Sequence, residues 1–514
     1  MSKNRKPMYH LLIACAIAMS ALAFLVPPLS QQPVAKAASA LALNPIQKEN
    51  LLPGTTNWEI SHPAPLDSSN YTHDKSIEGY ASMTSVAVKG TISFAVNTVS
   101  TTFTADTYRL GWYQGTGGRL MSSLTNLAGH SYTVPAPNPQ TGLVEAHWPW
   151  AFSITIPTSW VSGMYLVKLT DLNGEQSYIP FAVRSSVKSN YVFIYTANTD
   201  EAYNAWGGTS LYQDLTSTLP AGRAFQVSFD RPYAENYGAQ NVLSWEYPMI
   251  RWLEKDGYNV SYVSDVDVQT NPKILLGHHG ILIVGHSEYW SQQMRKNLQA
   301  AVNQGVNLAV FGANSLYWQI RYQTSSSSVP NRVITCYKSA ALDPQSNKKK
   351  NAQVTVQFRQ PPVNSPEQTL LGSMYNSYFA QGEGNYGFPW VVSDASSWVF
   401  AGTNLKNGDS IPGIVGYEFD SNFPDAAQPA TITGADQVSG VEVLSSSPVT
   451  DVYGNTSNAN STLYTAPSGA RVFNAGTIEW SWGLDPWTLY TIPPNAVNPA
   501  IQRITANILF NFLT

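Results

Sequence analysis

The chain has 514 residues and a formal net charge of −4, and charged side chains make up 12% of it, the same share as aromatic ones. A chain of this length exceeds what one hydrophobic core usually supports, so we expect at least two domains. Because there is no excess of positive charge, the composition gives no electrostatic reason for binding nucleic acid, and we expect no such partner.

An export signal is predicted at the N-terminus. A basic stretch at residues 3–6 precedes an apolar run at residues 11–26, and the Ala-Lys-Ala sequence at 35–37 offers a cleavage site. The sequence therefore predicts a signal peptide at 1–37 and a secreted, extracellular protein, with an uncleaved N-terminal anchor as the alternative. No later stretch is long and apolar enough to cross a bilayer, so we expect no integral membrane span once the signal is removed.

Loss of the signal peptide would also remove Cys15 and leave Cys336 as the single cysteine of the mature chain. One cysteine cannot form an intrachain disulfide, and a cysteine-based metal site is excluded as well. Cys336 follows an apolar pair, and we expect it to be buried.

Residues 53–185 are predicted to form a β-sandwich domain. Short runs of alternating apolar and polar residues are separated by turn residues, and Asn173-Gly174 is typical of a hairpin turn. These runs lie at 85–88, 91–96, 107–110, 152–156, 164–169 and 178–183.

The remainder, residues 187–514, is predicted to be an α/β domain. Apolar strands alternate with amphipathic helices, which favours a doubly wound, flavodoxin-like or amidotransferase-like sheet with β-rich insertions. We expect strands at 191–196, 260–263, 281–284 and 306–311, and helices after Ser244 as far as Gly257, at 291–304 and at 503–512.

Polar and titratable residues follow several of these strands. His286 and Glu288 come directly after the strand at 281–284, which Gly285 is expected to end, and Asn314 follows the strand at 306–311. In open α/β sheets, ligands bind just outside the carboxyl ends of the strands. The side chains should therefore meet in one crevice, together with Tyr203 and Tyr212 after the first strand and Glu418 after a later apolar run.

Other interpretations stay open for each residue. Glu288 could interact only with the N-terminus of the following helix, and Asn314 could stabilise a left-handed turn. Tyr203 and Tyr212 could be packing residues, since the chain has 28 tyrosines. Ser287 invites a nucleophile hypothesis, but it lacks the Gly-x-Ser-x-Gly turn that exposes such a serine.

Five short motifs follow one another along residues 190–514. They are YNAWGGTSLY at 203–212, SFDRPY at 228–233, GHSEYWS at 285–291, AVFGANSLYW at 309–318 and GIVGYEFD at 413–420. Together they resemble the large (beta) subunit of the N,N-dimethylformamidase family. The preceding domain, with RLGWYQGTGGR at 109–119, resembles the β-sandwich found ahead of it.

The resemblance implies an amide hydrolase with a mononuclear ferric iron. Carried over to this sequence, Tyr203, Tyr212 and Glu288 would be the iron ligands. His286 or Glu418 would transfer protons, and Asn314 would hydrogen-bond the developing oxyanion. Four aromatic residues are expected to wall the pocket, and they are Trp206, Tyr289, Trp290 and Trp318.

The function predicted from the sequence is hydrolysis of a linear amide or similar carbon–nitrogen bond in a small molecule, by an iron-activated water. The first alternative is a non-catalytic cell-surface or carbohydrate-binding protein on the same scaffold, which the many aromatic residues would suit. The second is an amidotransferase-like hydrolase that uses Ser287. The sequence leaves the substrate open, and also whether the chain forms a homo-oligomer.

Overall fold

Two mainly antiparallel sheets make up the N-terminal part of the protein. The computed structural model describes residues 42–67, 72–73, 76–346, 351–380, 387–422, 438–487, 489 and 496–514, and residues 43–514 belong to one compact unit. The signal peptide predicted at 1–37 lies outside the described residues, and the domain division predicted at 185–187 stays a prediction. None of the helices in these ranges has the length and apolarity of a transmembrane span.

The first of these sheets has five strands and the second has three, and apolar side chains from both belong to one hydrophobic cluster. Alternate residues are buried along β8 and the first part of β6, as the sequence predicts, whereas β9 and β10 are buried at nearly every position. The five-stranded order is β4 (Ser85–Ala87), β10 (Gln176–Arg184), β9 (Gly163–Asp171), β6 (Thr102–Leu110) and β7 (Gly118–Ala128). The three-stranded order is β3 (Ile77–Ala81), β5 (Thr91–Thr98) and β8 (Trp150–Thr155).

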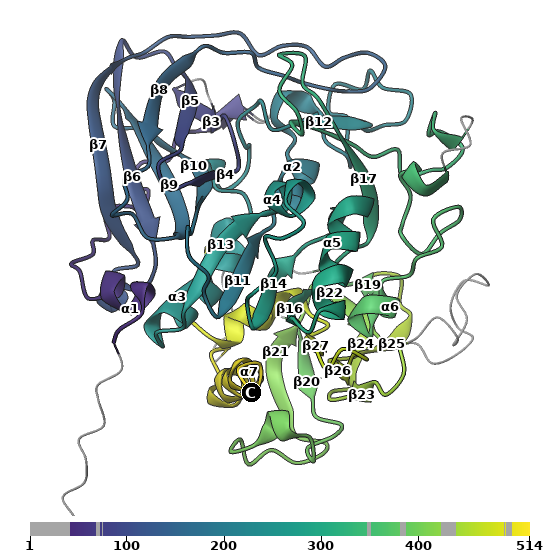
Figure 1. Cartoon of the computed structure of the whole chain (residues 1–514). Coiled ribbons are helices and arrows are strands. Elements are labelled where there is room, and N and C mark those ends of the chain that lie inside the picture. Colours follow the sequence, from purple (N-terminus) through teal and green to yellow (C-terminus); the bar gives the residue numbers. More distant parts are fainter. Residues whose placement is uncertain are drawn as a thin grey trace, which may run out of the picture. The chain divides into compact units, whose positions relative to one another are not determined.

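A seven-stranded sheet forms the centre of the remaining chain (Figure 1). Its first five strands are parallel, β26 is antiparallel to β27, and β23 is antiparallel to β26 and so runs in the direction of the first five. The order is β13 (Val260–Ser264), β11 (Tyr191–Tyr195), β14 (Gly280–His286), β16 (Asn307–Ala313), β27 (Arg471–Asn474), β26 (Thr462–Thr465) and β23 (Glu442–Val443). The overall class is therefore mixed α/β, as the sequence predicts.

Helices cover both faces of this sheet because successive strand residues point to opposite faces. Phe193 and Leu282 pack with α3 (Tyr247–Lys255) and α7 (Pro499–Asn511), whereas Val192 and Ile281 pack with α5 (Gln292–Asn303). Figure 1 shows α3 and α7 on one side of the teal strands and α5 on the other. The shorter helices are α1 (Pro45–Asn50), α2 (Ala197–Tyr203), α4 (Asp265–Thr270) and α6 (Gln368–Leu371).

Small sheets fill the long connections. A four-stranded sheet joins β12 (Gln226–Ser228), β18 (Val333–Thr335), β17 (Trp318–Gln323) and β15 (Tyr289–Ser291). Four two-stranded sheets pair β1 (Leu66–Asp67) with β2 (Thr72–His73), β19 (Met374–Tyr378) with β22 (Glu418–Ser421), β20 (Phe388–Val391) with β21 (Ser410–Val415), and β24 (Ser447–Thr450) with β25 (Thr456–Ala459). Cys336, which directly follows β18, is buried, as expected.

Two local predictions were wrong. Ser244 does not cap α3, because a π-helix at Val242–Glu246 leads directly into that helix. Gly285 does not end its strand, since β14 continues to His286 with Gly285 at φ +69°. A side chain is excluded at Gly285 because a Cβ there would lie 2.6 Å from the Cβ of Trp245.

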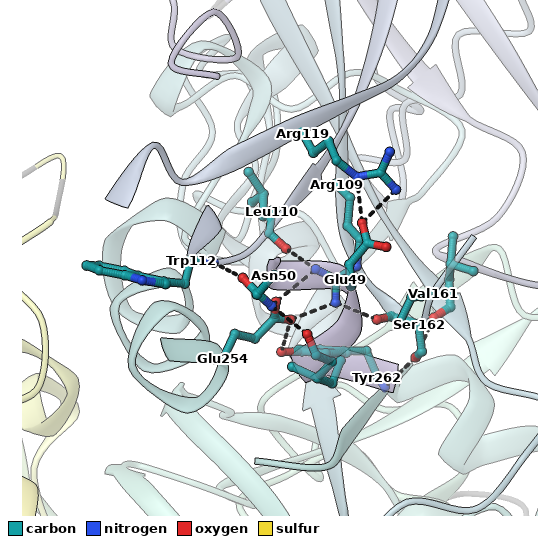
Figure 2. A network of polar contacts seen from close by, with 12 residues as sticks. Glu49, Asn50, Arg109, Leu110, Trp112, Arg119, Val161, Ser162, Glu254 and Tyr262 are labelled. Carbon is teal, nitrogen blue, oxygen red and sulfur yellow. Dashed lines mark hydrogen bonds and ion pairs between the residues drawn. The ribbon is translucent and has the colours of Figure 1, made fainter. Parts of the chain in front are cut away.

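A buried ion pair connects the N-terminal sheets to the α/β part (Figure 2). Arg109 of β6 donates two hydrogen bonds to the carboxylate of Glu254 on α3, at 2.7 and 2.8 Å, and neither side chain is exposed. Glu254 also accepts from Asn50 of α1 and from Tyr262 of β13. The four elements therefore share one carboxylate, whose desolvation is compensated only while all these donors are in place.

We expect Glu254→Gln to lower the free energy of unfolding by about 3–5 kcal/mol, because it leaves the Arg109 charge buried without a partner. Urea unfolding followed by tryptophan fluorescence measures the change. The matched control is Arg184→Gln, which breaks the partly exposed ion pair with Asp267 and should cost about 1 kcal/mol or less. Equal losses in the two variants would contradict this role.

Candidate functional site

The six residues predicted to form a site lie together at the carboxyl edge of the central sheet. Tyr203 ends α2, which follows β11, and His286 is the last residue of β14. Asn314 directly follows β16, with φ +49°. Glu418 begins β22, outside the central sheet. The strands β11, β14 and β16 are neighbours, so the convergence expected from topology is observed.

His286, Asn314 and Glu418 form a buried polar triangle. Nε2 of His286 lies 3.1 Å from Oε2 of Glu418, and Nδ2 of Asn314 donates to the same oxygen at 2.8 Å. The amide nitrogen of Asn314 also lies 3.2 Å from Nε2 of His286. Burial lowers the pKa of His286, but the carboxylates of Glu418 and Glu288 outweigh this effect and raise it above its usual value.

Glu288 links this triangle to the two tyrosines. Its Oε2 lies 3.4 Å from Nε2 of His286, and its Oε1 accepts a 2.5 Å hydrogen bond from the hydroxyl of Tyr212. The rings of Tyr203 and Tyr212 stack at 4.4 Å, and their hydroxyls lie close enough to interact. Burial, together with the carboxylate of Glu288, raises the pKa of both phenols well above the usual value, so both keep their protons.

The arrangement of oxygen atoms suits a hard cation. Oε2 of Glu288 and Oδ1 of Asn314 are buried and have no hydrogen-bond partner among the residues that the structure describes. No group of three or more His, Cys, Asp or Glu residues in the same ranges could hold a metal ion. The phenolic oxygens of Tyr203 and Tyr212 are further oxygen donors near Glu288, and anionic oxygens favour a small, highly charged ion.

Lys338 belongs to the same cluster, although no motif or periodic pattern in the sequence selects it. Its Nζ lies 3.2 Å from the centre of the Tyr212 ring. Tyr203 stacks on that ring at 4.4 Å, so the ammonium group must occupy the opposite face. Burial lowers the pKa of Lys338 to about 8, an effect that the carboxylate of Glu288 opposes. Lys338 thus brings positive charge to the phenol and carboxylate.

A cavity of about 220 Å³ opens beside His286 and Tyr203, and aromatic rings form most of its wall. The aromatic lining residues are Tyr203, Trp245, Tyr417 and Trp482, and the others are Glu235, Asn241 and His286.

None of the four aromatic residues predicted to wall the pocket lines this cavity. Trp206 packs on Trp148 and donates to Glu78, and Trp290 belongs to the core beneath α5. Trp318 and Tyr289 lie near Lys338 instead.

Three further carboxyl groups are buried behind the site, at Asp200, Glu246 and Asp265. Each has one oxygen without a hydrogen-bond partner in the described part of the chain. Burial raises the pKa of Glu246 to about 8, and it raises the pKa of Asp200 and Asp265 well above the usual range, with mutual repulsion adding to the shift. These groups are therefore largely protonated at neutral pH, which lets them lie close to one another.

Comparison with known proteins identifies one family. The sequence model described as N,N-dimethylformamidase beta subunit-like, C-terminal, matches residues 104–496, which is more than half of the chain. The match includes all six predicted site residues. No curated protein matches the chain.

The buried carboxyl of Glu246 should make stability depend on pH. Its pKa in the folded protein exceeds the ordinary value of 4.5, so between those two values the unfolded state releases a proton that the folded state keeps. Rising pH therefore favours unfolding across this window. Relative to Glu246→Gln, which cannot ionise, we expect the wild type to lose up to a few kcal/mol between pH 5 and pH 8, at about 1.4 kcal/mol per pKa unit.

Free energies of unfolding for both proteins at the two pH values measure this difference. Glu442→Gln, at an exposed residue of β23, is the matched control and should differ from the wild type by the same amount at pH 5 and pH 8. A pH-independent difference between the wild type and Glu246→Gln would show that Glu246 is ionised in the folded protein throughout.

Proposed function

This chain belongs to the N,N-dimethylformamidase beta subunit-like family, and from that premise we propose that it hydrolyses an amide or similar carbon–nitrogen bond in a small molecule. Family membership indicates the general enzyme class, which is that of the amidohydrolases. The observation that carries the proposal is the buried cluster in which Tyr203, Tyr212 and Glu288 lie against His286, Asn314 and Glu418.

We propose that Tyr203, Tyr212 and Glu288 hold a mononuclear ferric ion. Their oxygens are the hard ligands that such an ion prefers, and a nearby cation would favour the loss of the phenolic protons that burial retains. When bound, the ion would act as a Lewis acid that polarises the carbonyl and lowers the pKa of a water molecule. The ammonium group of Lys338 would favour the same anionic forms of Tyr212 and Glu288.

The remaining residues would move protons and orient the substrate. Nε2 of His286 lies between the carboxylates of Glu418 and Glu288, which stabilise a proton on it, so it can accept a proton during attack and return one to the leaving amine. One N–H of the Asn314 side-chain amide donates a hydrogen bond to Glu418. When Nε2 of His286 is itself protonated, the second proton of Asn314 is free to bond the developing oxyanion.

We also propose the setting that the sequence indicates. The protein would be secreted and would act on a small amide as its substrate. It would bind no nucleic acid and would have no membrane span apart from the signal peptide. The two N-terminal sheets share one core, which supports a β-sandwich. The parallel strand order β13-β11-β14-β16-β27 supports a flavodoxin-like arrangement for the larger part.

Protein purified from iron-replete cells should contain stoichiometric iron, should be coloured by tyrosinate-to-iron absorption, and should release dimethylamine or ammonia from N,N-dimethylformamide or formamide. Glu288→Gln should remove iron, colour and activity together, because it removes an anionic ligand. Elemental analysis, visible spectroscopy and amine release are the measurements.

Ser287→Ala, one residue away, is the matched control and should keep both iron and activity. If it keeps iron but is inactive, the serine hydrolase is the better explanation. A colourless, iron-free protein would contradict the proposal and favour a non-catalytic cell-surface or carbohydrate-binding protein.

Lys338→Met should keep the length of the side chain but remove its charge from the face of Tyr212. We expect kcat to fall about tenfold and the visible absorption band to shift. The reason is that the attraction between a desolvated cation and the face of an aromatic ring contributes about 1–2 kcal/mol. The exposed Lys406→Met is the control. An unchanged absorption band would show that Lys338 does not act on Tyr212.

A further inference from the structure

The cavity beside His286 has the wall of a cation-binding pocket. Trp245 comes from the π-helix before α3, Tyr417 from the connection between β21 and β22, and Trp482 from the 3-10 helix at Ile478–Gly483. The rings of Trp245 and Tyr417 are 6.0 Å apart and tilted by 38°. Rings that surround a space at different angles present several electron-rich faces to one ligand, which is how proteins bind alkylammonium groups.

Glu235 adds a negative charge to the same wall. It is an exposed residue that lines the cavity, and it takes part in no ion pair in the described ranges. Partial desolvation raises the pKa of this carboxyl. A carboxylate beside aromatic rings favours a cationic ligand over a neutral one of the same shape, because the ligand then meets both a ring face and an opposite charge.

The cavity also reaches the groups that would act on the amide bond. His286 lies in its wall, and its ring centre is 6.3 Å from that of Trp245. The positive charge that His286 can carry is compensated by carboxylate oxygens at 3.1 and 3.4 Å, so it does not exclude a second cation from the cavity.

We infer that this cavity binds an organic ammonium group through Trp245, Tyr417, Trp482 and Glu235. If the function proposed above holds, on which this step rests, the substrate is a small amide that also carries a positively charged nitrogen. A volume of about 220 Å³ suits a ligand of this size.

A pair of probes that differ only in charge tests the inference. Choline and 3,3-dimethylbutan-1-ol have the same shape, but a carbon replaces the charged nitrogen in the second compound. Isothermal titration of the purified full chain should show choline binding at least about tenfold more tightly than the alcohol. Glu235→Gln should weaken choline binding about fivefold and leave alcohol binding unchanged, and Glu442→Gln should change neither.

Three results would overturn the inference. They are equal affinity for the two compounds, no binding of either, and choline binding that Glu235→Gln does not alter. Binding of N-acetylglucosamine in preference to choline would assign the cavity to a carbohydrate instead. Titration requires no turnover, so the two proposals can fail separately. A protein that binds choline but hydrolyses no amide would contradict the proposed function and leave the assignment of the cavity unchanged.

Discussion

Buried negative charge is the constraint on which the arrangement of this site depends. Glu288, Glu418, Asp200, Glu246 and Asp265 are all buried, and an isolated carboxylate is very unfavourable in such surroundings. Each must therefore keep its proton or lie near a positive charge. Burial raises the pKa of Asp200, Glu246 and Asp265 and so favours their protonated forms, whereas Glu288 and Glu418 face His286. The same requirement explains why the ammonium group of Lys338 is held beside Tyr212, close to Glu288.

The side chains of the site come from two sources, which are the ends of the central strands and the insertions between them. The short parallel strands β11, β14 and β16 fix one row of residues at their carboxyl ends, and their backbones approach closely there. A Cβ at Gly312 would lie 2.1 Å from the carbonyl oxygen of Gly285, so this edge tolerates no side chain at that position. The insertions then supply Tyr212, Lys338 and Glu418 from above the edge. Rigid strands that carry functional side chains on their ends and on the connecting segments are a common way to position catalytic groups.

The part of the site on the sheet could be predicted because it depends on local sequence. A continuous apolar run identifies a buried strand, and the next polar residues must lie at its carboxyl end, which selects His286 and Asn314. The part contributed by insertions could not. Lys338, Trp245 and Trp482 come from irregular or short helical segments with no periodic pattern. Their proximity depends on contacts between segments far apart in the sequence.

The fifth parallel strand, β27, was missed for the same reason. More than 150 residues separate it from β16, and its four residues give no signal that distinguishes them from the neighbouring β runs. The aromatic residues show the limit most clearly. Trp206 and Trp290 lie within family-like motifs and yet pack in cores away from the cavity. Sequence proximity to a motif therefore indicated the correct strands but not which rings face the ligand.

The two ends of the cavity differ in electrostatic character, and this difference has a consequence for substrate orientation. His286 lines the cavity and has Nδ2 of Asn314 3.2 Å from its Nε2, so donors are available on that side, whereas Glu235 and the rings of Trp245 and Tyr417 elsewhere in the wall attract positive charge. An amide has its partial negative charge on the carbonyl oxygen. A small amide that carries an ammonium group would therefore enter in one orientation, with its oxygen toward the donors and its charged nitrogen toward the rings. The reverse orientation would place the cation against the donors and leave the carbonyl oxygen beside a carboxylate, so charge complementarity alone would align the scissile bond.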